Sequence, residues 1–488
     1  MKLLKTKSID KYIIITIFFL IFWITLLGRY SNDYDYLWHI KIGEQITNTG
    51  TITTNNTFTW LTNSEWNQQE WLFDVLLYNV VHIFNIYGFY IIHAVFSIIL
   101  FYVSVRIVKP KNIVLFGGVY LLVHLLLYAT PINRPSEYST FCFIIILYLY
   151  NKKIDFRNIL FYFLIGVFLS NFHCGQAIVL LGFMCAQFGL DFISALLYKD
   201  KEVISIRYIG YRICSILLFS IGLLVNPLGY TPIISMLKAI LADNSYISEW
   251  QPFQSSFVPQ IIGTLFLIIV LFCSKRKYSR KDFINIGLLC ILFVLTFKAI
   301  KSSTLLVYCY PILGYTYIEQ LFDKAPLEYN KRAIHHKWWI IISTSILSTI
   351  FCLLSFVYSY STMDKYVLNT SSEYISSDIV EYLKNNKPSR LLNGYAVGNI
   401  LLWNDIKVFQ DTRQHPYIKE MGYEDSVHIF MQMRKDKDGA IIDHYFKKYD
   451  FDAIVTNQEL DVTWWLKQRP DYVRIIDGEN CDLWIKDK

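Results

Sequence analysis

Two carboxylates and a histidine lie close together near the start of the chain, within the run SNDYDYLWH. Asp33 and Asp35 are two residues apart, and His39 follows four residues after Asp35, so a helix would place Asp35 and His39 on one face. Such a set suits ligation of a divalent cation or general acid–base catalysis. A simpler interpretation also stays open, in which Asp33 only caps a helix over residues 34–48 that ends at Gly50.

The composition places these residues in a membrane protein. The chain has 488 residues, of which 54% are hydrophobic and 17% are charged, and its mean hydropathy is +0.34. Ordinary soluble proteins carry about 25% charged residues. The net charge of +7 is explained by basic loops, so it does not indicate nucleic-acid binding. The nine cysteines have no paired spacing and fall mostly in apolar runs, which indicates small apolar residues rather than a disulfide or zinc framework.

Apolar runs predict about eleven transmembrane helices. The predicted spans cover residues 12–28, 89–107, 113–130, 136–150, 159–173, 176–197, 210–226, 258–273, 283–297, 303–318 and 338–358. Residues 71–87 are also apolar, but Asp74 and His82 interrupt them, and we expect this helix to lie in the interface. The loops on one side then hold most of the basic residues, which makes that side cytoplasmic. The N-terminus therefore lies inside, and the first loop, about residues 29–88, lies outside.

The remainder of the chain differs in kind, because charges occur throughout it and it contains no spanning segment. Residues 453–457 read as a buried strand, residues 460–468 as a helix, and residues 472–476 and 481–486 as a hairpin. The predicted fold is therefore mainly α-helical. It consists of a polytopic transmembrane bundle over residues 1–360 and a small extracytoplasmic α/β domain over residues 361–488.

This topology gathers unusual polar and aromatic residues on the outer side. Ionisable residues at membrane depth are costly and usually functional. The cations that suit a phosphate are Arg134, Lys298 and Lys301, and the side chains that suit a substrate are Trp38, Glu70, Trp71, His173, Glu249 and Trp250. Simpler explanations exist for some of these residues. Arginine and lysine at span ends can extend to headgroups, and a histidine at a helix end is often a hydrogen-bonded structural residue.

Residues 32–78 resemble the first outer loop of bacterial GT-C-type glycosyltransferase-like membrane proteins. The likeness rests on an Asp-x-Asp-x-x-Trp-His-x-x-x-Gly-Glu run, a later tryptophan and a Glu-Trp-Leu run. Weaker matches follow in the expected order at Arg134-Pro135, residues 171–175, residues 226–229, Glu249-Trp250, Lys301 before Pro311, and residues 393–413. The resemblance implies a GT-C fold and transfer of a sugar from a polyprenyl-phosphate donor to an outer acceptor. It matches Asp33 to a carboxylate that acts as base or metal ligand, and Asp35 to its neighbour.

Two positions depart from the pattern of this family. The family usually has aspartate at position 56 and histidine at position 69, whereas this chain has Asn56 and Gln69. The loss of a carboxylate and a histidine weakens a multi-ligand metal centre in this loop. Asp33, Asp35 and His39 are nevertheless in place.

We therefore expect a membrane glycosyltransferase in which Asp33 accepts the proton of an acceptor hydroxyl. Asp35 would orient the acceptor or bind Mg²⁺ or Mn²⁺ together with Asp33, and His39 would complete the catalytic set. The outer cations would stabilise the phosphate leaving group. The family analogy implies inversion at the anomeric carbon. The acceptor would be a glycan, lipid or protein in the biosynthesis of envelope polysaccharide at the inner, cytoplasmic membrane.

Two other classes of function remain open. One is a non-catalytic transporter or flippase of lipid-linked saccharides, and the other is an inactive member that binds envelope polymer or a partner protein. The residues at positions 56 and 69 favour the inactive member. Hydrolases of two common kinds are excluded, because the sequence has no Gly-x-Ser-x-Gly and no His-Glu-x-x-His motif.

Overall fold

The computed structural model describes most of the chain at the level of side chains. The described residues are 34–61, 65–85, 87–126, 134–152, 155–242, 250–251, 278–298, 303–323, 374–457, 460–478 and 480–487. The predicted spans at residues 12–28, 258–273 and 338–358 lie outside them. Contacts divide the chain into two units. The first comprises residues 1–30, 89–225 and 247–360, and the second comprises residues 31–88, 226–246 and 361–488.

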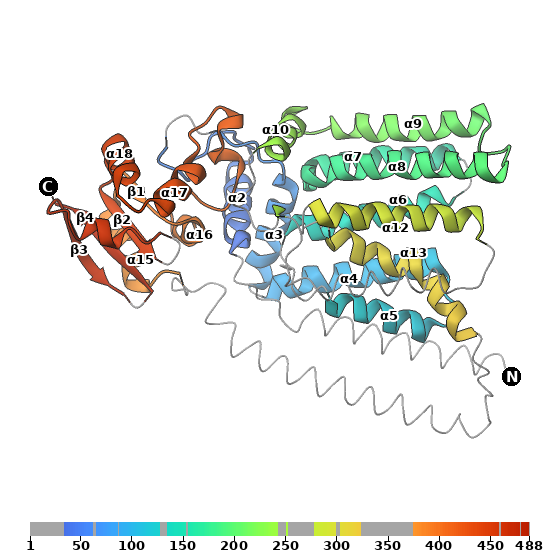
Figure 1. Ribbon diagram of the computed structural model, residues 1–488, viewed down its shortest axis with the longest axis horizontal. Coiled ribbons are helices and arrows are strands. Elements are labelled where there is room, and N and C mark those ends of the chain that lie inside the picture. The colour runs from blue at the N-terminus through green and yellow to red at the C-terminus, as the bar shows by residue number, and fades with distance from the viewer. Residues whose placement is uncertain are drawn as a thin grey trace, which may run out of the picture. The chain divides into compact units, whose positions relative to one another are not determined.

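The first unit is a bundle of helices that lie side by side with roughly parallel axes (Figure 1). Its described helices are α4 (Tyr87–Val108), α5 (Ile113–Leu126), α6 (Pro135–Tyr150), α7 (Phe156–Phe172), α8 (Cys174–Tyr198), α9 (Ile206–Leu223), α12 (Arg280–Lys298) and α13 (Ser303–Asp323). Each lies on a predicted span. The chain is thus mainly helical, as predicted.

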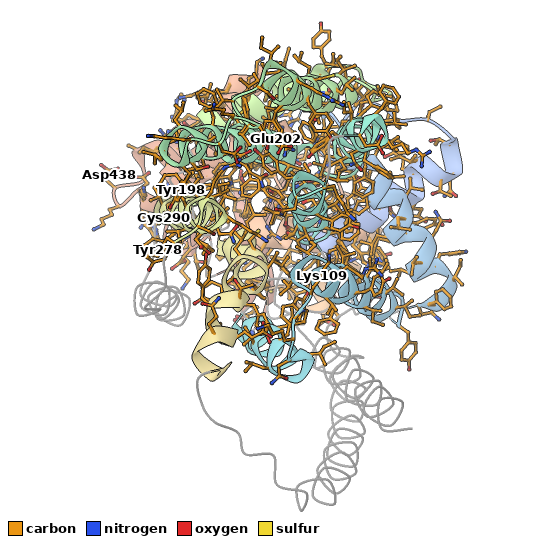
Figure 2. All side chains as sticks on the ribbon, turned by 90° about the vertical axis from the view of Figure 1, so that its right-hand side faces the viewer. Lys109, Tyr198, Glu202, Tyr278, Cys290 and Asp438 are labelled. Atoms are coloured by element: carbon orange, nitrogen blue, oxygen red, sulfur yellow. The ribbon has the colours of Figure 1, made fainter. Side chains whose placement is uncertain are left out.

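The basic connections of this bundle gather at one end. Figure 2 looks onto that end, where Lys109 follows α4, Tyr198 ends α8, Glu202 lies in the next turn and Tyr278 precedes α12. The Tyr198 hydroxyl donates a hydrogen bond to the Tyr278 carbonyl at 3.2 Å. The predicted membrane topology of the bundle stays a prediction.

Two described helices, α8 and α9, are long and apolar enough to cross a membrane. Both also expose apolar side chains outward, including Leu196 and Leu197 on α8 and Leu217 and Ile221 on α9. An exposed apolar face of this kind suits contact with lipid. Shorter apolar helices occur at Trp71–Phe84, Ile98–Val108, Tyr138–Tyr150, Phe156–Phe172 and Thr231–Leu241. The count of eleven spans stays a prediction.

Two glycines let α7 and α9 approach each other closely. A Cβ atom on Gly166 would lie 2.3 Å from the Phe219 carbonyl oxygen, and one on Gly222 would lie 2.3 Å from the Phe163 carbonyl oxygen. Both obstacles are backbone atoms, which cannot turn aside as a flexible side chain can. Small residues at the crossing are the usual means of close helix packing in membranes.

Replacing Gly166 or Gly222 with leucine is therefore expected to destabilise the bundle by about 1–3 kcal/mol, because the two helices must separate. The measurement is the midpoint of thermal unfolding of the protein in lipid discs. Gly182→Leu on α8 and Gly210→Leu on α9 are matched controls, since a Cβ atom at either position meets nothing within 4 Å. Equal midpoints for all four variants would contradict the close crossing.

The second unit contains a four-stranded sheet in the order β1-β2-β4-β3. The strands are β1 (Leu391–Leu392), β2 (Ala453–Asn457), β3 (Tyr472–Asp477) and β4 (Cys481–Lys486). β1 and β2 are parallel, with Leu392 opposite Ile454, and the other pairs are antiparallel. The predicted strand at residues 453–457 and the predicted hairpin are thus confirmed.

Helices accompany the sheet in sequence order α15 (Ser377–Asn386), α16 (Tyr395–Trp403), α17 (Ser426–Lys435), α18 (Ala440–Tyr449) and α19 (Thr463–Leu466). Residues from α17, α18, α19 and all four strands build one apolar core. The predicted helix at residues 460–468 is present only as the four-residue α19, because the Leu460 amide turns back to Asn457.

Residues from the first loop, residues 31–88, complete the second unit. α2 (Asp35–Thr49) packs on α3 (Trp71–Phe84), where a Cβ atom on Gly43 would lie 2.0 Å from the Asp74 carbonyl oxygen. Between these helices the chain runs beside the C-terminal segment, by which we mean the part of the second unit within residues 361–488. The Thr59 hydroxyl donates to the Val408 carbonyl at 2.7 Å. The Trp60 indole nitrogen donates to the Leu391 carbonyl at 2.9 Å. The first loop and the C-terminal segment therefore belong to one folded unit.

Candidate functional site

Asp35 begins α2 and is buried. The N-cap position of this helix is Tyr34, which makes no side-chain cap. The helix thus begins at Asp35, one residue later than predicted, and the cap role of Asp33 stays a prediction. Asp33 itself lies outside the described residues. Asp35 occupies the first turn instead, where the helix dipole favours a negative charge. The predicted end of the helix is confirmed, since Gly50 has φ = 66° and its amide donates to the Ile46 carbonyl.

The C-terminal segment holds the Asp35 carboxylate. Its Oδ1 accepts a hydrogen bond from the Thr412 hydroxyl and another from the Asn399 side-chain amide, the latter at 3.3 Å. Asn399 and Thr412 are joined in turn, because the Asn399 amide nitrogen donates to the Thr412 hydroxyl at 2.8 Å. Gly398 makes this arrangement possible, since a Cβ atom there would lie 2.1 Å from the Gln410 carbonyl oxygen. The carboxylate is thus fixed from outside its own helix.

His39 lies one turn further along α2 and takes different partners. Its Nδ1 lies 2.5 Å from Asp74 Oδ1, and its Nε2 lies 3.9 Å from Glu70 Oε2. The ring is buried, and Phe73 packs on it edge to face with ring centroids 4.9 Å apart. A histidine between two carboxylates can hold a proton and pass it on, which is the acid–base chemistry expected from the sequence.

Asp74 is fully buried on α3. Burial raises the pKa of Asp74 well above its ordinary value, Glu70 raises it further, and Arg413 opposes the rise. The Asp74–His39 pair therefore retains a proton that an exposed aspartate would release. Asp74 Oδ2 has no hydrogen-bond partner among the described residues.

A buried ion pair lies beside these groups in the C-terminal segment. Arg413 donates to both carboxylate oxygens of Asp411, at 2.8 Å from Nε and 2.5 Å from Nη2. Tyr417 donates to the same carboxylate at 2.6 Å, and the guanidinium carbon lies 4.7 Å from the centre of the Trp66 ring. Burial lowers the pKa of Arg413, but the Asp411 carboxylate and Tyr417 raise it more, so Arg413 remains charged.

The two departures from the family pattern contact this same segment. Asn56 accepts a hydrogen bond from Arg413 Nη2 at 3.2 Å. The Gln69 amide nitrogen lies 3.2 Å from His415 Nε2. Both residues are buried. Positions 56 and 69 therefore join the first loop to the C-terminal segment.

The predicted aromatic and acidic substrate ligands of the first loop are close to the same groups. Trp38 packs edge to face on Trp66, with ring centroids 5.6 Å apart, and Trp71 packs against this cluster half-buried. Glu70 is the residue before α3 and approaches His39. Trp38, Glu70 and Trp71 thus lie in one unit with Asp35 and His39.

Of the two predicted metal ligands, Asp33 and Asp35, the structure describes only Asp35. Within the part of the chain that the structure describes, no three His, Cys, Asp or Glu side chains are arranged to hold a metal ion. The environment of Asp35 nevertheless fits a ligand carboxylate, since ligating carboxylates are normally oriented by hydrogen bonds such as those from Thr412 and Asn399.

The other predicted site residues belong to the first unit or lie outside the described residues. Arg134 is the extended residue before α6, and His173 lies between α7 and α8 with Nδ1 3.2 Å from the Ser139 hydroxyl. Trp250 is half-buried. Lys298 ends α12, but its side chain is outside the described part. Asp33, Glu249 and Lys301 lie outside the described residues altogether.

The sequence analysis did not identify the partners of the predicted carboxylate and histidine. Asp74 had a usable signal, because a lone aspartate in an apolar helix is costly unless it is paired. Asn399 and Thr412 lie in residues 393–413, which resemble the family, but nothing in that resemblance indicated contact with Asp35, which is more than 360 positions away.

No protein-family model and no curated protein matches the sequence. The structure is similar to the crystal structure of the Archaeoglobus fulgidus oligosaccharyltransferase in the apo form. The TM-score is 0.56 at 9% sequence identity, and the match covers 94% of this chain and 70% of that chain. It is also similar to the oligosaccharyltransferase AglB of the same organism in complex with an inhibitory peptide and a dolichol-phosphate. Here the TM-score is 0.56 at 10% identity, with 95% of this chain and 71% of that chain covered.

These similarities establish the fold. The chain has the GT-C-type fold that the resemblance of its first outer loop indicated, and that prediction is confirmed.

Proposed function

We propose that this protein is a membrane glycosyltransferase that moves a sugar from a polyprenyl-phosphate donor to an acceptor on the outer face of the membrane. One observation carries the proposal. In a chain with the GT-C-type fold, the buried Asp35 carboxylate stands at the start of the first outer helix and is fixed there by Thr412 and Asn399.

The reaction follows from the charges. A lone pair of the acceptor hydroxyl oxygen attacks the anomeric carbon of the sugar, and the bond between that carbon and the phosphate oxygen breaks. Asp33 accepts the hydroxyl proton as general base. The polyprenyl phosphate leaves with the bonding electron pair, and a single displacement of this kind inverts the anomeric carbon.

The described residues support this step by positioning. Thr412 and Asn399 orient Asp35, which in turn orients the acceptor or a divalent cation held with Asp33. Such a cation, Mg²⁺ or Mn²⁺, would supply Lewis-acid stabilisation of the phosphate charge. His39 and Asp74 offer a place for the released proton, one helical turn from Asp35.

The lipid-linked donor is proposed from two lines of support. Arg134, Lys298 and Lys301 occupy predicted outer ends of spans, where cations would stabilise a phosphate leaving group. The solved AglB structure contains a dolichol-phosphate and an inhibitory peptide. By analogy, the acceptor of this protein is a peptide or a glycan. His173, Glu249 and Trp250 are the proposed substrate contacts of the first unit.

The test is transfer of a labelled sugar from a polyprenyl-phosphate donor by the purified full chain in membrane lipid. We expect Asp33→Asn and Asp35→Asn each to lower the turnover number by about 10²-fold or more, as loss of a general base or of its positioning group does. Glu44→Gln is the matched control, because Glu44 is also on α2 but is exposed and pairs with Lys41.

Turnover by the Asp33 and Asp35 variants equal to that of Glu44→Gln would overturn the proposal. Binding of the donor by both variants, measured separately with the same labelled lipid, ensures that a loss of turnover is not a loss of folding.

A further inference from the structure

The short helix α10 (Thr231–Leu241) exposes an apolar stripe although its opposite face is packed. Tyr230, Ile234, Leu237 and Leu241 recur at intervals of four, three and four residues, so they lie on one side of the helix. Their exposed fractions are 65%, 43%, 44% and 83%. Single exposed apolar side chains are common on protein surfaces, but four large ones on one helix face form a contiguous patch, which is typical of an interaction site.

The opposite face of α10 is built into the second unit. Pro232, Ser235, Met236 and Ala239 are buried there. The Ser235 hydroxyl accepts a hydrogen bond from the Asn67 side chain at 2.6 Å, and α10 contacts the 3-10 turn η6 (Lys419–Met421). The packed face fixes which side of the helix points outward.

The length of α10 and its short link to α9 indicate that a membrane surface covers the exposed stripe. Eleven residues of helix extend only about 16 Å, about half of what a span requires. The helix also follows α9, which is long and apolar enough to span, after only residues 224–230. Those seven residues reach about 25 Å at most when extended, so the chain keeps the start of α10 within that distance of the end of α9.

The composition of the stripe favours the same occupant. Lys238 is exposed beside Leu237, and a lysine at the edge of an apolar face can place its ammonium group among lipid phosphates. Tyr230 at the start of the stripe is a residue type enriched at membrane–water interfaces. A helix with an apolar face, an aromatic residue and a lysine is typical of segments that lie in the interface plane.

We propose that α10 is an interfacial anchor whose Tyr230–Leu241 stripe lies in the headgroup region of the outer leaflet. The packed face of α10 contacts two segments that carry residues of the candidate site. Asn67 follows Trp66, which stacks on Arg413, and η6 follows the segment that carries Arg413 and Tyr417. The anchor therefore sets the height of both site-bearing segments above the bilayer.

The proposal is tested by hydroxyl-radical footprinting of the full chain in lipid discs that hold a single copy. The lipid is phosphatidylcholine with a minor fraction of phosphatidylglycerol. Labelling of each side chain is divided by its labelling in a free peptide of the same sequence. We expect Tyr230 and Leu241 to be labelled at least about fivefold less than Val473 and Ile475, because lipid excludes water from the stripe. Val473 and Ile475 are the internal controls, since they are 45% and 46% exposed on β3.

The double variant L237D/L241D separates lipid from protein as the cover, because it alters only the exposed stripe. If lipid covers the stripe, two charges release it from the bilayer and labelling of Tyr230 rises to that of Val473. Tyr230 and Leu241 labelled as strongly as Val473 in the unaltered chain would overturn the proposal. So would protection of Tyr230 that persists in the double variant, or protection that requires two copies per disc. None of these readouts depends on sugar transfer.

Discussion

Arg413→Leu is expected to lower the stability of the second unit by about 3–5 kcal/mol, which is the usual result of removing one partner of a buried ion pair. The reason is the carboxylate that stays behind. Asp411 is fully buried, and without the guanidinium it keeps only the Tyr417 hydroxyl and the Arg413 backbone amide as donors among its described hydrogen bonds. Asn56 also loses the group that donates to it.

The measurement is the rate at which a protease cleaves the full chain within residues 374–457 under native conditions, which reports the population of the open form. A change of 3–5 kcal/mol corresponds to an increase of about 10²- to 10³-fold or more in that population. Arg390→Leu is the matched control, because Arg390 and Asp450 form a pair in which both side chains are about half exposed. Such surface pairs contribute about 1 kcal/mol or less.

A double variant distinguishes the ion pair from general disruption of packing. In D411L/R413L no charge is left uncompensated, and replacement of both partners of a buried pair by apolar residues is often nearly neutral. We expect it to be more stable than R413L alone. A double variant less stable than R413L would show that Arg413 acts mainly through its stacking on Trp66 and Phe58.

Trp60→Ala is the second change with a large expected effect. The indole packs among Phe409, Tyr449 and Phe451, with ring centroids 5.7, 6.2 and 6.1 Å away. Removal of a packed aromatic ring costs about 3–5 kcal/mol. The loss falls at the junction of the first loop with the sheet, so we expect residues 51–61 to detach and the hold on Asp35 to weaken.

Trp60→Phe is the informative comparison. It retains an aromatic ring but removes the 2.9 Å hydrogen bond to the Leu391 carbonyl, which is worth about 1 kcal/mol. Amide hydrogen exchange of residues 51–61 in the full chain measures both variants. The attachment described here requires fast exchange in Trp60→Ala and nearly unchanged exchange in Trp60→Phe. Slow exchange in both variants would mean that other contacts hold the loop.

Local patterns in the sequence predicted the elements of this fold well. Long apolar runs marked the helices of the first unit to within a few residues, a short apolar run marked β2, and a hairpin pattern marked β3 and β4. The shortening of α19 was not predictable, because an apolar run such as Leu460–Leu466 reads as a helix until the backbone turn at Asn457 is known. The start of α2 was placed one residue too early, because several capping residues, Ser31, Asn32 and Asp33, precede it in a row.

The candidate site was predictable in its residue types but not in its contacts. Asp35 and His39 attracted attention because charged groups are unusual beside an apolar segment. Their partners come from other elements, and hydrogen bonds between distant segments leave no spacing that a single sequence can display. The same holds for Asn56 and Gln69. Their departure from the family pattern was visible, whereas their contacts with Arg413 and His415 are properties of the folded unit.

The bond between Thr412 and Asp35 also bears on how the protein is made. These residues are 377 positions apart. At a synthesis rate of about 5–20 residues per second, Asp35 precedes Thr412 by about 20 to 75 s. During that interval the carboxylate is without the Thr412 and Asn399 side chains that later hold it. A chain released before residue 399 lacks both side chains. The Asp35 carboxylate is therefore held by these two hydrogen bonds only in chains synthesised beyond Thr412.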